Sequence, residues 1–100
     1  MDPGKSDIQI SDVVISTAGR DQGESYYVIR VEGEYLHLVN GRSRPLESPK
    51  RKKRKHVEKV LRSETRVADK LRSGDKVLNG ELRRDLASLS RGMQANNLGG

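Results

Sequence analysis

Hydrophobic and polar positions alternate along much of the first half of the chain. From Asp12 to about Asn40, apolar residues recur at every second position in three separate runs. A period of two is typical of β-strands that bury one face. The pattern therefore predicts three short strands, whose apolar residues are Val13 and Ile15, then Tyr27, Ile29 and Val31, then Leu36 and Leu38.

Turn-forming residues separate these strands. Gly19 and Gly23 lie in a polar segment between the first two strands, and glycine readily adopts the positive φ angles that a tight turn requires. Gly33 marks a hairpin turn before the third strand. Asn40-Gly41 is the strongest two-residue turn signal in the chain, and it predicts a fourth strand around Arg42 to Glu47.

A last strand is predicted around His56 to Val60, with Val57 and either Val60 or Leu61 as its apolar residues. A small sheet of short strands satisfies its edges best when it curls into a barrel. We therefore expect a mostly β fold, with a small SH3-like barrel over residues 10–62. Residues 1–9 are expected to form a flexible leader, which joins the fold near Ile8 or Ile10.

After residue 62 the spacing of apolar residues becomes helical. Ser63 or Thr65 can cap a first helix, and Ser73-Gly74 ends it. The apolar face of this helix is expected to hold Val67, Ala68 and Leu71.

A second helix is predicted from Asn79, as its cap, to Arg91-Gly92. Its leucines Leu82, Leu86 and Leu89 follow at spacings of four and three, which places them on one face. Residues 63–100 are thus expected to form a C-terminal helical hairpin and tail. Three possibilities stay open for the hairpin, because it can pack on the barrel, dock on a partner, or order only within a complex.

The composition limits the core and the chemistry. Of the 100 residues 32% are hydrophobic and the aromatic ones are all tyrosines, so one thin core of valine, isoleucine and leucine is expected. At least one of Tyr26, Tyr27 and Tyr35 should pack in that core. The chain has no cysteine and two histidines, His37 and His56, which excludes disulfides and argues against a structural zinc site.

Catalysis is not expected either. Asp21, Glu24 and Ser25 lie near one another in the first turn, but no nucleophile, base and orienting group can be assembled from them with a histidine or cysteine. We therefore expect no enzymatic activity, cofactor or small-molecule substrate. The first twenty residues hold no apolar run, so no signal peptide or membrane span is expected, and the lack of cysteine favours the cytoplasm.

Positive charge is concentrated in one segment. Nine basic and two acidic residues lie between Arg42 and Lys59, so this segment carries a net charge of +7, against +6 for the whole chain. Six cations follow one another from Lys50 to Lys55. Such cations repel one another, but along a phosphate backbone they release condensed counterions and gain salt-dependent affinity. Nucleic acid is therefore the predicted partner.

RNA is favoured over DNA because no helix presents a recognition face of the helix-turn-helix kind, and no zinc finger or basic zipper is possible. A rigid barrel with polar loops suits folded RNA, which is recognised by its shape and phosphate positions. Alternative interpretations of the basic segment are a solvated linker and a nuclear-localisation string at Pro49 to Lys55. A second hypothesis for the chain is a protein-interaction adaptor that docks on a ribosomal or transcription protein through the barrel or the Leu82, Leu86, Leu89 face.

Several stretches resemble a known RNA-binding motif. Asp12 to Gly23, with its Ala18-Gly19-Arg20-Asp21 turn, and the strand Tyr26 to Val31 look like a KOW motif, the strand-loop-strand unit of ribosomal proteins and transcription elongation factors. Leu36 to Gly41 and Arg44 to His56 extend the similarity. Over roughly residues 10–61 the chain resembles the KOW group related to large-subunit ribosomal proteins of the L-fourteen-e type, including short bacterial relatives.

This resemblance implies an SH3-like KOW barrel that binds ribosomal RNA. Gly23 would be the characteristic glycine of the motif, and Gly19, Arg20 and Asp21 would lie in the loop that faces RNA. A ribosome-associated RNA-binding protein, with ribosomal proteins as possible further partners, is thus the leading hypothesis.

The chain departs from the motif at two places. Ser11 stands where the motif usually has glycine, and Gln22 and Glu24 stand where the family often has lysine. The loop is therefore less basic than in the family, and we expect the basic segment to supply most phosphate contacts. The complete set of predicted RNA-binding residues is Gly19, Arg20, Asp21, Gly23, Arg42, Arg44, Lys50, Arg51, Lys52, Lys53, Arg54, Lys55 and His56.

Overall fold

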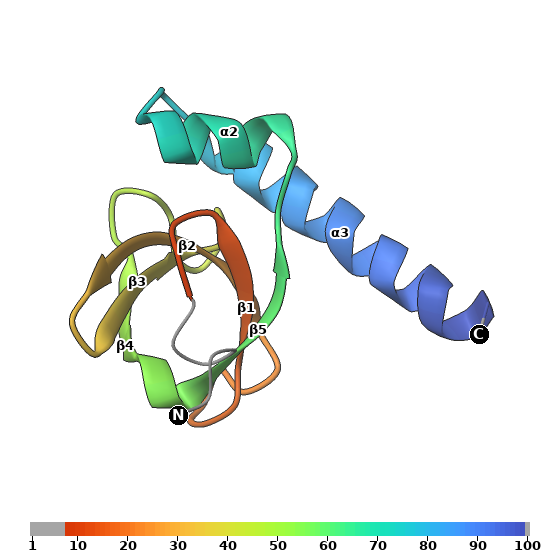
Figure 1. The fold of residues 1–100 in the computed structure, drawn as a ribbon, viewed down its shortest axis with the longest axis horizontal. Coiled ribbons are helices and arrows are strands. Elements are labelled where there is room, and N and C mark those ends of the chain that lie inside the picture. Colours follow the sequence, from red (N-terminus) through yellow and green to blue (C-terminus); the bar gives the residue numbers. More distant parts are fainter. Residues whose placement is uncertain (1–7, 100) are drawn as a thin grey trace.

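The computed structural model describes the backbone of residues 8–99 and the side chains of residues 8–90. Within this described part, five strands form one antiparallel sheet in the order β4-β3-β2-β1-β5 (Figure 1). The strands are β1 (Asp12–Ser16), β2 (Ser25–Glu32), β3 (Tyr35–Val39), β4 (Lys50–Lys53) and β5 (Val57–Arg62). The prediction of a small, mostly β domain followed by helices is confirmed, and the curled sheet is consistent with an SH3-like barrel.

A short 3-10 helix, η1 (Arg54–His56), joins the two edge strands β4 and β5. The backbone N–H of Arg54 donates to the carbonyl of Glu34 at 2.7 Å, in the turn between β2 and β3. At the other side of η1, the N–H of Thr17 donates to the carbonyl of His56 at 2.9 Å. Because η1 is bonded to both sides, it closes the barrel where the edge strands do not pair.

The sheet buries residues on both of its faces. The inner face forms the barrel core, which consists of Ile8, Val14, Tyr26, Val28, Leu36, Leu38 and Val57. The outer face of β1, β2 and β3 contributes Val13, Tyr27 and Val39 to a second core. Val13 and Val14, like Tyr26 and Tyr27, are therefore neighbours in sequence that are buried on opposite faces. A strict period of two describes only part of this pattern.

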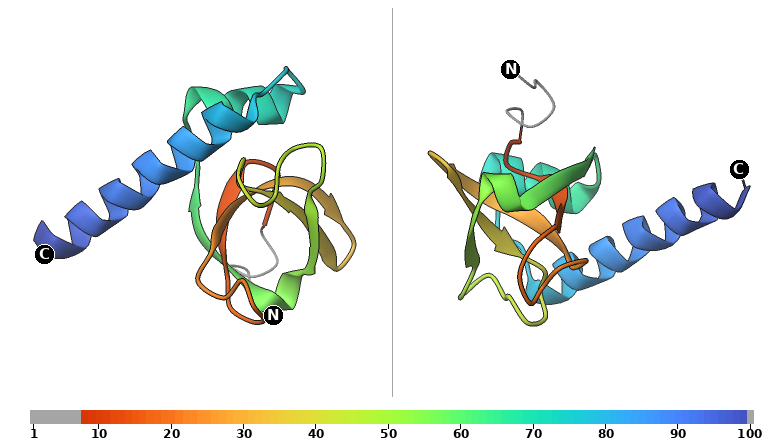
Figure 2. Two further views of the ribbon diagram at one scale, coloured as in Figure 1. Left: turned by 180° about the vertical axis from the view of Figure 1, so that it is seen from behind. Right: turned by 90° about the horizontal axis from the view of Figure 1, so that it is seen from below.

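The helical hairpin packs on the barrel, so the structure decides among the three possibilities left open by the sequence. Helix α2 (Arg66–Ser73) contributes Val67 and Ala68 to the second core, and α3 (Asn79–Gly99) contributes Leu82 and Leu86. Thr65 caps α2 by accepting from the N–H of Ala68, as predicted. The second half of α3 extends beyond the barrel (Figure 2).

A polar cluster fixes the hairpin to the sheet. The hydroxyl of the fully buried Tyr27, on β2, donates to the carboxylate of Asp85 on α3 and contacts Ser63 Oγ at 2.7 Å. Thr65 Oγ1 donates to the same carboxylate at 2.8 Å. Burial, together with the hydrogen bond to Asp85, raises the pKa of Tyr27 to about 12. The phenol therefore stays protonated and keeps donating at physiological pH.

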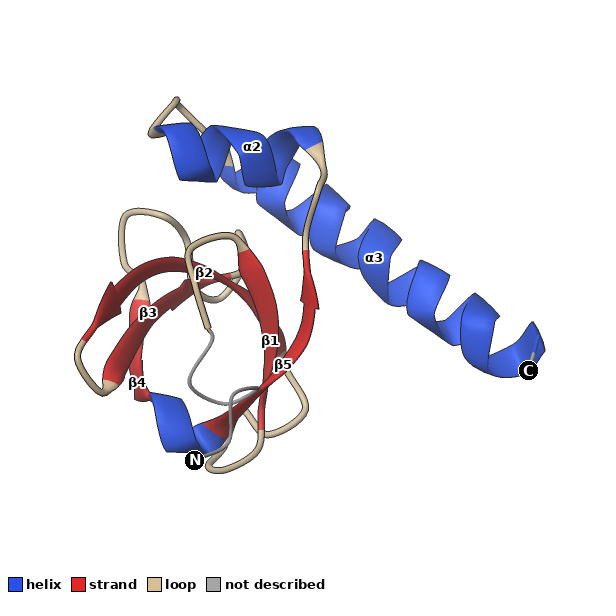
Figure 3. Cartoon of the chain, viewed as in Figure 1, coloured by secondary structure: helices blue, strands red, loops and turns tan. Residues whose placement is uncertain are grey.

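The predicted strand at Arg42 to Glu47 is wrong, because residues 41–49 form a loop and the fourth strand begins at Lys50 (Figure 3). Asn40 Oδ1 accepts from the N–H groups of Arg42 and Arg44, at 2.9 and 3.0 Å. The N–H of Leu46 donates to Asn79 Oδ1 at 2.8 Å. Asparagine side chains thus take the hydrogen bonds that a strand would have given to its neighbour.

The second helix also differs from its prediction at both ends. Asn79 is the first helical residue, and Leu78 precedes it with its carbonyl accepting from Leu82 and its N–H donating to Glu81 Oε1 at 3.0 Å. The helix continues to Gly99 instead of ending near Arg91-Gly92. A single glycine costs a helix only about 1 kcal/mol, so Gly92 alone does not end it.

The N-terminal segment enters the barrel at Ile8, which is buried in the inner core. Residues 1–7 of the predicted leader lie outside the described residues. Ser11 adopts a φ of 76°, in the left-handed region that glycine prefers. Its hydroxyl accepts from Arg72 Nη1 at 2.7 Å, which ties the entry of β1 to α2.

Replacing Tyr27 by phenylalanine tests the polar cluster. The change leaves the partly buried Asp85 carboxylate without its phenol donor, so the free energy of unfolding should fall by about 1–3 kcal/mol. Urea unfolding followed by circular dichroism measures the change. Tyr35→Phe is the matched control, because the Tyr35 hydroxyl makes no hydrogen bond within the described residues, and it should change stability little. Equal effects of the two substitutions would contradict the role of the cluster.

Gly41→Ala tests the contact between the loop and α3. Gly41 has a φ of 76°, and a Cβ there would lie 2.2 Å from the carbonyl oxygen of Asn79. Gly74 has a similar φ of 80° and open space around its Cα. Gly74→Ala should therefore cost about 1–2 kcal/mol from backbone strain, and Gly41→Ala about 1–3 kcal/mol more from the clash. Equal losses in urea unfolding would show that the loop moves away from α3 at no cost.

Candidate nucleic-acid interface

The basic segment is divided by the pleat of β4. Its residues pair in register with β3, so that Lys50 and Lys52 stand opposite Leu38 and Leu36, which belong to the inner core. Arg51 and Lys53 stand opposite His37 and Tyr35, on the outer face. Four consecutive cations therefore project alternately toward the barrel interior and away from it.

The two inward lysines share one carboxylate. Asp21, in the β1–β2 loop, accepts from Lys52 Nζ at 3.0 Å and lies 3.5 Å from Lys50 Nζ. Lys52 Nζ also donates to the carbonyl of Ala18 at 2.9 Å, and its side chain is only 9% exposed. This lysine is therefore committed to an internal ion pair.

Further donors converge on the same carboxylate. Ser16 Oγ donates to Asp21 Oδ1 at 3.0 Å, and the hydroxyl of Tyr26 donates to Oδ2 at 3.1 Å. Burial on its own would raise the pKa of Asp21, but the hydrogen bonds from Lys52, Ser16 and Tyr26 outweigh it and hold this pKa far below its usual range. Burial and the bond to Asp21 raise the pKa of Tyr26 to about 12. Asp21 is thus ionised throughout the physiological range.

The outward cations surround one aromatic ring. The guanidinium carbon of Arg51 lies 3.6 Å from the centroid of the Tyr35 ring, and Lys53 Nζ lies 5.9 Å from it. Both cations are exposed, whereas Tyr35 is half-buried. A cation held over an aromatic face keeps its charge while its side chain loses freedom. Arg51 thereby presents a flat, ordered guanidinium to the outside.

This surface continues across the sheet as a row of paired positions. Arg30 on β2 stands opposite His37 on β3, which stands opposite Arg51 on β4. Glu32 lies 3.1 Å from His37 Nε2, 3.7 Å from Arg30 and 3.8 Å from Arg51. The hydrogen bond from His37 and the nearby arginines lower the pKa of Glu32. We call the set Arg30, Glu32, Tyr35, His37, Arg51 and Lys53 the outer basic face.

The remaining residues predicted to bind RNA belong to η1 and to two loops of the barrel. In η1, Lys55 is exposed, whereas Arg54 and His56 are half-buried. Gly19 and Gly23 have φ values of 87° and 92°, so the predicted tight turn is confirmed, and Arg20 beside them is exposed. Arg42, which is exposed, and Arg44, which is half-buried, belong to the β3–β4 loop. Because neighbouring strands are antiparallel, this loop and the β1–β2 loop leave the barrel at the same end.

Arg30 and His37 complete the outer basic face but were not among the predicted binding residues. Only the pairing register between strands brings them beside Arg51, and a register is not visible in a sequence. The prediction that at least one tyrosine packs in the core is confirmed, since Tyr26 and Tyr27 lie in the two cores. His37 projects to the opposite face of β3 from Leu36 and Leu38.

Among the described residues, no group of three or more histidine, cysteine, aspartate or glutamate side chains is placed to hold a metal ion. None of the helices in the described part of the chain combines the length and the apolar character needed to cross a membrane.

Neither the models of protein families nor the curated proteins gave a match to this chain.

Asp21→Asn tests the ion-pair cluster. Asparagine retains the shape but loses the charge that neutralises Lys52, so the free energy of unfolding at pH 7 should fall by about 1–3 kcal/mol. Because folding lowers the pKa of Asp21, its contribution is complete above the pKa of the unfolded chain, about 4, and is lost as the pH falls below that value.

The difference between wild type and variant in urea unfolding should therefore shrink between pH 5 and pH 2, where the titration is measured. Asp75→Asn removes the same charge at an exposed site and should have little effect at any pH. A difference that is constant with pH would contradict the assigned ion pair.

Proposed function

We propose that this chain is a non-catalytic RNA-binding protein that contacts phosphates through the outer basic face and the adjoining Lys55. The observation that carries this proposal is that the cations of β4 point alternately to the inside and to the outside of the barrel. Lys50 and Lys52 are neutralised internally by Asp21, whereas Arg51 and Lys53 remain exposed beside Tyr35. An ordered array of cations over an aromatic ring suits a polyanion with accessible bases.

RNA is the nucleic acid that this surface favours. Unpaired bases of RNA loops stack on aromatic rings or on guanidinium planes, and Arg51 presents such a plane, held over Tyr35. Among the side chains described, the apolar residues of α2 and α3 pack against the barrel, so this part of the two helices leaves no amphipathic face free for the major groove of DNA. The resemblance to KOW proteins supports ribosomal RNA as the target, and with it a cytoplasmic, ribosome-associated role.

The adaptor hypothesis loses one of its two proposed surfaces. Leu82 is fully buried, Leu86 is 8% exposed, and Leu89 packs against the same core, so the leucine face is covered by the barrel. Leu86→Asp should therefore unfold the junction between helix and sheet in addition to any effect on a complex. RNA binding is the function that the exposed groups support best.

A salt series tests the proposal. We compare wild type with the triple variant Arg51→Gln, Lys53→Gln, Lys55→Gln in binding to fragments of ribosomal RNA and to duplex DNA. Loss of three phosphate contacts should reduce the slope of log affinity against log salt by about 2. Lys52 is left unchanged, because its removal would disturb folding.

The control variant carries Arg66→Gln, Lys76→Gln and Arg84→Gln, three exposed cations of the helical part. It has the same net charge as the triple variant and should retain the wild-type slope and the preference for RNA. An equal loss of RNA affinity in both variants would show that binding depends on net charge alone. Absence of any RNA preference in the wild type would contradict the proposed function.

A further inference from the structure

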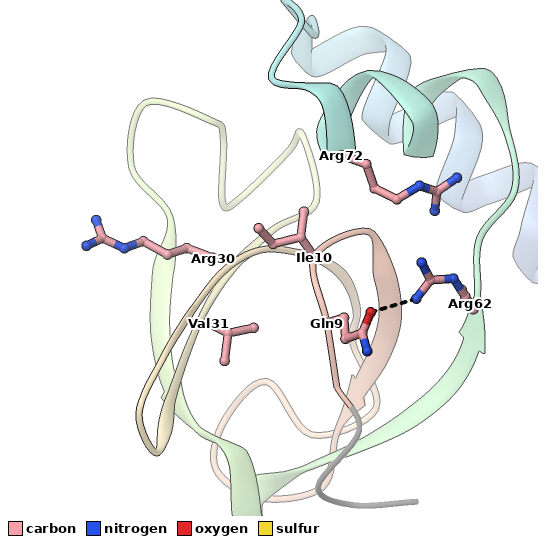
Figure 4. A pocket seen from close by; sticks show the side chains of 6 residues that line it. All are labelled: Gln9, Ile10, Arg30, Val31, Arg62 and Arg72. Atoms are coloured by element: carbon pink, nitrogen blue, oxygen red, sulfur yellow. Dashed lines mark hydrogen bonds between the residues drawn. The ribbon is translucent and has the colours of Figure 1, made fainter.

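A pocket of about 390 Å³ opens between the entry to β1, strands β2 and β5, and helix α2. Its lining combines apolar and cationic side chains and contains no carboxylate (Figure 4). The residues are Gln9, Ile10, Arg30, Val31, Arg62 and Arg72. None of them belongs to the RNA-binding set predicted from the sequence.

Two arginines of the pocket are held in place by the fold. Arg72 Nη1 donates to Ser11 Oγ at 2.7 Å and to the carbonyl of Ser63 at 2.9 Å. Arg62 Nη1 donates to Gln9 Oε1 at 3.0 Å. The two guanidinium groups lie on the same side of Ile10 (Figure 4). Because they are already ordered, an anion that binds them pays little additional entropy.

Glu64 marks where an anion fits between these arginines. Its carboxylate lies 3.8 Å from Arg62 Nε and 3.6 Å from Arg72 Nη2. The Glu64 side chain is 73% exposed, and ion pairs at such exposure and distance contribute little. An anion that makes additional contacts with the pocket can therefore displace it.

The opposite wall of the pocket is apolar. Ile10 is 38% exposed although it is a large hydrophobic residue, and Val31 is half-buried at the edge of the inner core. Together they offer a small hydrophobic surface next to the paired guanidinium groups. This combination suits a ligand with an anionic group and a flat apolar part.

The pocket is continuous with the outer basic face. Arg30 lines the pocket, yet its guanidinium is directed away from Arg62 and Arg72 (Figure 4). Arg30 stands opposite His37, which stands opposite Arg51, so the row crosses two strand spacings, roughly 10 Å. A strand of RNA that lies on the outer basic face can thus reach the pocket with a neighbouring nucleotide.

We propose that this pocket binds one unpaired nucleotide of the RNA, with its phosphate between Arg62 and Arg72 and its base against Ile10 and Val31. The inference rests on the proposed RNA-binding function and adds a second contact point to it. A peptide carboxylate is the less suitable occupant. Glu64 already supplies a carboxylate at high effective concentration, whereas a nucleotide brings a base that contacts Ile10 and Val31 in addition to the charge of its phosphate.

The test is an NMR titration of the full chain with uridine 5′-monophosphate. Methyl signals of Ile10 and Val31 and the Nε–H signals of Arg62 and Arg72 should shift together with a single affinity. Uridine without phosphate should bind at least about tenfold more weakly, the size of a lost charge-assisted contact. An acetylated peptide with a free terminal carboxylate should also bind more weakly, because it has no base to contact Ile10 and Val31. Tighter binding of the peptide would overturn the assignment in favour of a protein ligand.

Three variants sharpen the test. Arg62→Gln should weaken binding of the nucleotide about threefold to tenfold. Glu64→Gln, at an exposed site, should strengthen it about twofold to fivefold, because the carboxylate that lies between Arg62 and Arg72 is removed while Asp69 keeps its ion pair with Arg72 Nη2 at 2.6 Å. The Arg51, Lys53, Lys55 triple variant should bind the mononucleotide like wild type. Shifts that are absent, or unchanged in Arg62→Gln and Glu64→Gln, would overturn the inference. If RNA still binds in the salt series while the pocket fails these tests, the proposed function stands without the pocket.

Discussion

The carboxylate of Asp21 allows four consecutive cations, Lys50 to Lys53, to form strand β4, because it neutralises the two lysines that point inward. Lys50 and Lys52 project inward beside Asp21, and without a counter-charge their ammonium groups would meet a poorly solvated environment. Hydrogen bonds from Ser16 and Tyr26 hold the carboxylate in position. The β1–β2 loop and β4 are thereby joined, although they are 31 residues apart at the Lys52–Asp21 contact. The outward cations keep their orientation because the inward ones are fixed.

A sheet buried on both faces explains how so small a chain forms a stable domain. The inner core closes the barrel, and the hairpin of α2 and α3 adds a second layer over β1, β2 and β3. Tyr27 joins the two layers through Asp85 and Ser63. The hairpin is therefore part of the folded unit. It leaves the outer basic face, on the other part of β2 and β3 and on β4, open for a ligand.

Local signals predicted the elements that are stabilised by local chemistry. Alternation predicted β1 to β3, and Thr65 and Gly74 delimited the first helix, because caps and pleats depend on near neighbours. Ser11, which departs from the KOW pattern, nevertheless adopts the positive φ that a glycine would supply. Long-range contacts explain the failures. Asn40 bonds its own loop, so the turn at Asn40-Gly41 does not start a strand there.

The candidate site was predictable in its composition but not in its geometry. The sequence identifies the basic run, yet the division into inward and outward cations depends on the register of β4 against β3 and on Asp21. The same register brings Arg30 and His37 beside Arg51. Six adjacent cations in a sequence therefore correspond to two different roles, one in folding and one on the surface.

The most direct test of this division is to follow the side-chain NMR signals of all four β4 residues while ribosomal RNA is added. The account predicts that the guanidinium signals of Arg51 and the ammonium-proximal signals of Lys53 change with RNA, while those of Lys50 and Lys52 stay at their free positions. Equal changes at all four residues would contradict it, because the inward lysines would then have left Asp21 to bind phosphate.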